Sequence, residues 1–169
     1  VAARPSRLSV TAIETLIRDP YAIYARDILK LDPVDPIGGD PGAAEKGTLI
    51  HDILADFLES WTGPFDAAAE ARLLEIGRSR FSQVDAFPAI RAIWWLRFER
   101  IASAFLRNEA GWAGEIVERH LEIAGAMELD LTPGRVVTLS ARADRIDLRA
   151  DGSHAVIDYK TGQAPSAKE

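Results

Sequence analysis

The sequence contains no cysteine, which excludes disulfide bonds, zinc–thiolate sites, cysteine nucleophiles and any iron–sulfur cluster held by this chain. It also lacks long apolar runs: stretches such as Ala92–Leu96 extend over a few residues, whereas a membrane-spanning helix needs about 20. No basic segment leads into an apolar stretch of signal-peptide length. We therefore expect a cytoplasmic protein with no membrane partner, whose metal ligands are oxygen and nitrogen. Because the chain starts at Val1, we interpret it as a fragment of a longer chain.

The composition is that of one folded domain, expected to span residues 1–169. Hydrophobic residues make up 47% of the sequence and charged residues 27%, which excludes a disordered chain. The net charge of −6 argues against a surface that binds phosphate throughout. A local basic strip remains compatible with this charge.

The two halves of the chain differ in the period of their apolar residues. The period is helical from about Leu8 to Asn108 and alternates as in strands from about Glu115 to Lys160. Three long helices are predicted, over residues 47–61, 65–82 and 89–108. Four strands are predicted, over residues 115–123, 127–131, 136–148 and 154–159, and Gly125 is expected to end the first. The predicted class is α/β of the α+β type, with a mixed or antiparallel central sheet of about four strands flanked by helices.

The residues that suggest chemistry lie near the end of the strand region. Asp158 and Lys160 share one face of the last predicted strand, where a buried charge is costly unless it is paired or binds a metal. If Asp144 on the preceding strand joins that face, two carboxylates lie close together and repel each other unless a cation binds. Hard oxygen ligands favour Mg²⁺ or Mn²⁺, with Lys160 beside the ion. A simple ion pair between Asp158 and Lys160 is the alternative.

This arrangement requires a particular hairpin register across Asp151-Gly152. For Asp144 and Asp158 to share a face, the numbers of paired residues must add to an even number. The loop then holds an odd number of residues, or one strand contains a bulge. A two-residue loop that pairs Ala150 with Ser153 would place Asp144 on the other face.

Two segments, 143–147 (Ala-Asp-Arg-Ile-Asp) and 158–162 (Asp-Tyr-Lys-Thr-Gly), with 14 residues from Asp144 to Asp158, resemble the motif of PD-(D/E)XK nucleases of RecB type. Residues 47–51 (Gly-Thr-Leu-Ile-His) resemble the helical motif that carries a histidine metal ligand in that group. The segment from Leu8 to Tyr21, and the helix with Trp94, Arg97, Phe98 and Glu99, resemble the nuclease domain of AddB subunits of helicase–nuclease complexes.

The resemblance implies a restriction-endonuclease-like core and a metal-dependent DNA nuclease in double-strand break repair, with an AddA-like helicase–nuclease subunit as partner. It also implies that His51, Asp144, Asp158 and the Tyr159 carbonyl hold Mg²⁺ or Mn²⁺ and that Lys160 is the catalytic lysine. Many AddB-like domains carry four cysteines for an iron–sulfur cluster, which this chain lacks. The family domain also continues into a helix bearing Gln and Tyr, so we expect the chain to be truncated at its C-terminal end.

Two other function classes stay open. One is a nuclease-fold domain that binds DNA or its partner subunit without cleaving, and the other is a stand-alone RecB-type exonuclease.

Further expectations concern individual side chains. Arg97, Arg100 and Arg107 form either a solvated helix face or a DNA contact. Glu118 is an auxiliary metal ligand at most, and Asp147 is expected to form an ion pair with Arg145 or Arg149 because its parity is opposite to that of Asp144.

Overall fold

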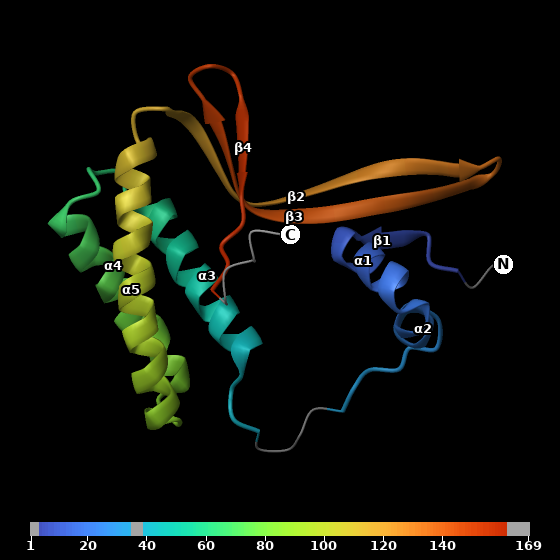
Figure 1. Cartoon of the computed structure of the whole chain (residues 1–169), viewed down its shortest axis with the longest axis horizontal. Helices are drawn as coiled ribbons and strands as arrows, with labels where there is room; N and C mark the ends of the chain where they lie inside the picture. Colours follow the sequence, from blue (N-terminus) through green and yellow to red (C-terminus); the bar gives the residue numbers. More distant parts are fainter. Residues whose placement is uncertain (1–3, 35–38, 162–169) are drawn as a thin grey trace. The chain divides into compact units, whose positions relative to one another are not determined.

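The computed structural model describes residues 4–34 and 39–161, which form two compact units (Figure 1). The first unit comprises residues 1–39 and 123–143, and the second comprises residues 40–122 and 144–169. Two long strands pass from one unit into the other, and each unit has its own cluster of buried side chains. None of the helices in the described part of the chain combines the length and the apolar character of a membrane span.

The first unit begins with short elements, namely β1 (Arg7–Ser9), α1 (Val10–Arg18), α2 (Pro20–Ile23) and the π-helical turn η1 (Tyr24–Ile28). The Ser9 hydroxyl caps α1 by accepting a hydrogen bond from the Ala12 amide at 3.0 Å. The Asp19 side chain caps α2 in the same way. The small core of this unit consists of Leu8, Ala12 and Ile23, packed with Ile13 and Leu16.

The second unit contains the long helices, which are α3 (Ala43–Ser60), α4 (Ala67–Phe81), the 3₁₀ turn η2 (Ser82–Val84) and α5 (Pro88–Trp112). All three predicted long helices are confirmed. Helix α3 starts earlier than its apolar pattern indicates, because the Glu45 side chain accepts a hydrogen bond from the Gly42 amide at 2.9 Å and so secures the helix start. The main core lies among these helices, with Phe57, Phe81 and Phe98 fully buried.

The sheet consists of β1, β2 (Ile116–Thr132), β3 (Arg135–Arg149) and β4 (His154–Ile157). Its order is β1-β3-β2, and β4 also pairs with β3. β1 runs parallel to β3, with Leu8 opposite Leu139, whereas β4 runs antiparallel to β3, with Ile146 opposite Val156. The fold is therefore mixed α+β, with a four-stranded mixed sheet flanked by helices, as predicted.

Two details of the predicted strands are wrong. Gly125 does not end a strand, because β2 runs through it as one element of 17 residues. A glycine weakens a strand only modestly, and hydrogen bonding to β3 outweighs that preference. The sequence pattern also fails to reveal β1, whose three residues are too few to show an alternation.

The register of the β3–β4 hairpin is the predicted one. Arg145 pairs with Ile157 and Ile146 with Val156, so the residue numbers of each pair add to an even number. The Arg149 amide donates to the Ser153 carbonyl at 2.9 Å, which leaves a loop of three residues between them. Within that loop Gly152 has a φ of 82°, the left-handed conformation that three-residue hairpin loops require at this position.

We expect Gly77→Ala to destabilise the second unit, although alanine normally favours a helix by about 1 kcal/mol over glycine. A Cβ atom at Gly77 would lie 2.8 Å from Cζ of the fully buried Phe98. Overpacking of this kind costs about 1–3 kcal/mol. Urea denaturation should show a lower unfolding free energy. Gly111→Ala, where nothing lies within 4 Å of the added atom, is the control and should be neutral or stabilising.

Candidate metal and nuclease site

Helix α3 carries the first residue of the site. Its apolar face, which includes Ile50 and Leu54, is buried, and His51 follows on the edge of that face with 26% of its side chain exposed. The Gly47 end of the helix lies beside the segment that follows β4, because a Cβ atom at Gly47 would be 3.5 Å from the Thr161 hydroxyl. The helical motif and the strand motif therefore meet in space, as expected.

His51 lies between a carboxylate and a main-chain carbonyl. Its Nδ1 atom is 3.4 Å from Oδ2 of Asp144, and its Nε2 atom is 2.5 Å from the carbonyl oxygen of Tyr159. The same Oδ2 atom of Asp144 accepts a hydrogen bond from the Tyr159 amide at 2.8 Å. Three residues that are far apart in the sequence thus form a closed set of contacts around the main chain of Tyr159.

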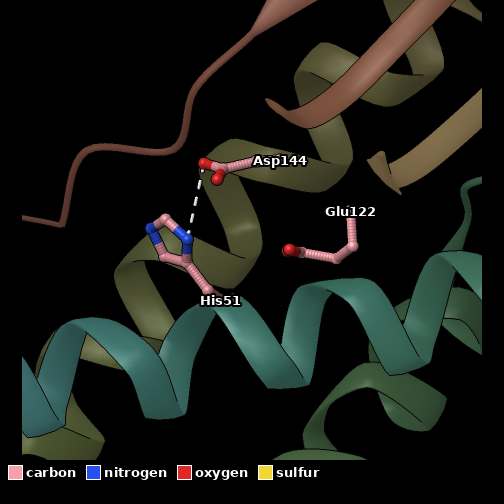
Figure 2. A group of neighbouring side chains, drawn as sticks. All are labelled: His51, Glu122 and Asp144. Carbon is pink, nitrogen blue, oxygen red and sulfur yellow. Dashed lines mark ion pairs between the residues drawn. The ribbon is translucent and has the colours of Figure 1, made fainter. Parts of the chain in front are cut away.

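Glu122 on β2 completes a group of three possible ligands with His51 and Asp144. One ligand atom from each residue lies within 4.8 Å of the other two. Figure 2 shows the His51 ring reaching from α3 toward the Asp144 carboxylate, with the Glu122 carboxylate next to the ring. Glu122 has a φ of 48°, an uncommon conformation for a residue with a side chain. Backbone strain of this kind occurs preferentially at functional sites.

The donor set of this group fits a hard divalent cation. If Nε2 of His51 carries the proton given to Tyr159, Nδ1 presents a lone pair to the negatively charged Asp144. A lone pair and a carboxylate repel each other at 3.4 Å unless a proton or a cation lies between them. One imidazole nitrogen with two carboxylates matches Mn²⁺ well and Mg²⁺ less well. All three residues belong to the second unit.

The structure does not bring Asp158 and Lys160 into the group of His51, Glu122 and Asp144. Continued by one residue beyond β4, the register of the hairpin would place Asp158 opposite Asp144, but 56% of the Asp158 side chain is exposed. Its Oδ2 atom forms an ion pair with Nζ of Lys160 at 2.6 Å. The Asp158–Lys160 ion pair of the sequence alternative is present, and the role of Asp158 as a metal ligand stays a prediction. Gly162, the last residue of the motif, lies outside the described residues.

The opposite face of β3 carries a buried ion network. Arg145 and Asp147, both essentially inaccessible to solvent, form a two-pronged ion pair, and Arg145 also bonds Glu109 from α5. Arg119 on β2 joins the network by donating to Glu109 at 2.7 Å and to Asp147 at 3.4 Å. Two arginines thus face two carboxylates. The predicted pairing of Asp147 with Arg145 is confirmed.

The network also reaches the hydroxyl of Tyr159. Arg145 donates to the Tyr159 hydroxyl at 3.1 Å. Burial opposes the charge of Arg145, but the hydrogen bonds to Asp147 and Glu109 outweigh it and raise its pKa above the ordinary value. Burial raises the pKa of Tyr159 above its ordinary value and outweighs the opposite effect of Arg145, so the hydroxyl remains neutral at pH 7. Arg145 therefore stays charged beside a neutral phenol.

The remaining candidates lie on the surface. Arg97, Arg100 and Arg107 on α5 are exposed. Glu118, expected as an auxiliary ligand, instead lies 3.3 Å from His120 with 58% of its side chain exposed. The carboxylate beside His51 and Asp144 is Glu122, which regular strand alternation would place on the same face as Glu118. The left-handed backbone at Glu122 breaks that alternation, and a glutamate at this position gives no sequence signal of such a break.

The sequence analysis does not identify Glu109 as a member of a buried ion network, although its position in the helix is a signal for that role. It falls on the apolar face of α5, in helical register with Phe98, Ala102 and Phe105, all of which are buried. A carboxylate on such a face needs a buried partner. Arginines on neighbouring strands are the available partners, and the structure provides two of them.

Comparison with known proteins identifies a protein family and related proteins for this chain. The sequence model described as the PD-(D/E)XK nuclease superfamily matches residues 7–169. An uncharacterized protein of Rickettsia bellii is 30% identical over 165 residues, which cover 98% of this chain and 20% of that protein. An uncharacterized protein of Rickettsia typhi is 30% identical over 169 residues, covering 98% of this chain and 19% of that protein. The chain thus spans about a fifth of the length of these relatives.

We expect Glu109→Ala to lower the unfolding free energy by about 3–5 kcal/mol, because it removes a carboxylate from two buried or half-buried arginines. Urea denaturation measures the loss. The control is Glu75→Ala, which removes an exposed partner of Arg72 and should cost about 0–1 kcal/mol. Equal effects of the two substitutions would show that the buried network contributes no more than a surface ion pair.

Proposed function

Because the chain belongs to the PD-(D/E)XK nuclease superfamily, we propose that it is the metal-dependent DNA nuclease domain of an AddB-like subunit. In this proposal it hydrolyses phosphodiester bonds at broken DNA ends during recombinational repair in the cytoplasm. Its partner is an AddA-like helicase–nuclease subunit. The mixed sheet flanked by helices is consistent with the restriction-endonuclease-like fold of the superfamily.

The observation that carries the proposal is the convergence of His51, Asp144 and the main chain of Tyr159. These groups come from α3, β3 and the segment after β4, and their donor chemistry fits Mg²⁺ or Mn²⁺. We propose Asp158 as a further ligand because its register matches that of Asp144. Glu122 adds a carboxylate to the same place.

A divalent ion held there would polarise the scissile phosphate and lower the pKa of an attacking water. The chain's own residues supply the rest of the proposed chemistry. Lys160 extends from the end of the hairpin with 69% of its side chain exposed, so a DNA backbone has access to it. Its ammonium group would stabilise the negative charge that develops on the phosphate. Arg97, Arg100 and Arg107 are proposed phosphate contacts on α5.

A second candidate function is a nuclease-fold domain that binds DNA or the partner subunit without cleaving. One observation favours it: Lys160 is paired with Asp158, and Asp158 lies outside the group formed by His51, Glu122 and Asp144. The two candidate functions differ in metal binding and in the effect of losing Lys160. Both differences can be measured directly.

Titration with Mn²⁺ tests the ligand set. We expect Asp144→Asn and Asp158→Ala each to weaken Mn²⁺ binding by more than about 10-fold. Residues that only support a ligand typically change metal affinity by about 10–100-fold, and loss of a direct ligand should cost more than the lower end of that range. Glu118→Gln is the control, since this surface carboxylate lies on the same strand as Glu122. Unchanged binding by Asp158→Ala would mean that Asp158 is no ligand and that Glu122 takes its place.

Replacement of Lys160 tests catalysis. Lys160→Ala should leave the fold intact because the side chain is exposed, and should slow cleavage by about 10²–10³, the usual effect of losing one stabilising charge. The assay follows end-labelled duplex DNA with ATP and Mg²⁺ in the helicase–nuclease complex, where unwinding should persist. Arg72→Ala removes another exposed cation and is the control. Wild-type cleavage of both strands by a folded Lys160→Ala protein would favour the non-catalytic domain.

A further inference from the structure

Tyr159 connects the two faces of the β3–β4 hairpin. On one face its amide donates to Asp144 and its carbonyl accepts from His51. On the other face its hydroxyl accepts a hydrogen bond from Arg145 at 3.1 Å. Its ring also contacts His51 edge-on, with 6.1 Å between ring centroids and an interplanar angle of 88°. A displacement of Tyr159 would therefore alter the positions of both His51 and Asp144.

Tyr159 lies beyond the end of regular pairing, because β4 ends at Ile157. The backbone hydrogen bonds of a sheet therefore do not hold it directly. Its side chain provides the restraint: the ring packs against Phe105 of α5, and the hydroxyl bonds Arg145. A tyrosine ring fixed at both ends leaves little freedom to its own main chain.

Arg145 is well suited to act as the fixed point. Its side chain is fully buried, and its fork contacts Asp147 with two nitrogens and Glu109 with the third. The nitrogen that bonds Glu109 is also the one that bonds the Tyr159 hydroxyl. A lysine has a single nitrogen and cannot reproduce this fork. The position of the Tyr159 hydroxyl thus depends on an arginine held by two carboxylates.

We infer that Arg145 is a positioning residue of the metal site, which acts through the Tyr159 hydroxyl to hold the Tyr159 main chain against His51 and Asp144. This inference rests on the proposed function, because it deepens the role of the same site. Residues that support metal ligands from behind typically change metal affinity or activity by about 10–100-fold when they are altered. Among the described residues, Arg145 donates its side-chain hydrogen bonds to Asp147, Glu109 and the Tyr159 hydroxyl, and to no proposed ligand side chain.

The test uses two mild substitutions, because removal of the Arg145 charge would leave Glu109 and Asp147 short of a partner and threaten folding. Tyr159→Phe deletes only the hydroxyl, and Arg145→Lys keeps the charge but loses the fork. Mn²⁺ affinity is measured for both and for the double variant. Each single change should weaken binding by about 10-fold, and the double variant should be no weaker than the single variants, because both remove one connection.

The matched control is Arg80→Lys. Arg80 forms a two-pronged ion pair with Asp56 of α3, at 2.7 and 2.9 Å, so Arg80→Lys loses a similar fork without removing a contact of Tyr159. If the loss of any arginine fork in the second unit lowered Mn²⁺ affinity, this variant would show the effect as well. The nitrogen resonances of the three histidines supply an independent readout in the metal-free chain. In Tyr159→Phe only those of His51 should shift, and those of His120 and His154 should not.

The outcomes separate this inference from the proposed function. If wild-type chain binds Mn²⁺ and both variants bind it equally well, Arg145 is structural only and the inference fails while the metal site stands. Effects that multiply in the double variant would also overturn it, because Arg145 and Tyr159 would then act separately. If the wild-type chain binds no Mn²⁺, the proposed function fails and the inference falls with it.

Discussion

The buried ion network between α5 and the sheet is the interaction on which the rest of the second unit depends. Four charges, from Glu109, Arg119, Arg145 and Asp147, balance in pairs, so each is compensated in a place where an unpaired charge would be unstable. A well-packed apolar cluster of the same volume would be about as stable. The charges contribute directional hydrogen bonds, which hold one helix, two strands and Tyr159 in one relative position.

Strand β3 supplies the network and the candidate site from successive residues. Asp144 points to one face and Arg145 to the other, since side chains alternate along a strand. A register slip of one residue would exchange the faces, placing Arg145 in the site and Asp144 beneath the helix. The three-residue loop with its left-handed Gly152 excludes this slip. The short loop therefore determines which carboxylate can reach His51.

Parity arguments predict the parts of this site that lie on regular structure. The shared face of Asp144 and Asp158 and the pairing of Asp147 with Arg145 follow from alternation, and the helical period places His51 beside an apolar face. The same argument fails for Glu122, because its φ of 48° rotates the side chain out of the alternation. The expectation that Gly125 ends a strand is wrong for another reason: pairing with β3 decides where β2 ends, and pairing depends on residues far away in the sequence.

The strength of the Asp158–Lys160 ion pair can be compared with the attraction of Asp158 to a metal ion in the proposed site. This ion pair is exposed, and such pairs contribute about 0–1 kcal/mol. A divalent ion attracts a carboxylate more strongly than a solvated ammonium does, because its charge is double and its ligands approach more closely. In the proposed metal site, the pair would therefore not prevent Asp158 from binding the ion. Asp144 differs, because the Tyr159 amide and His51 already hold its carboxylate, so in the proposed site it would be the fixed ligand around which the others assemble.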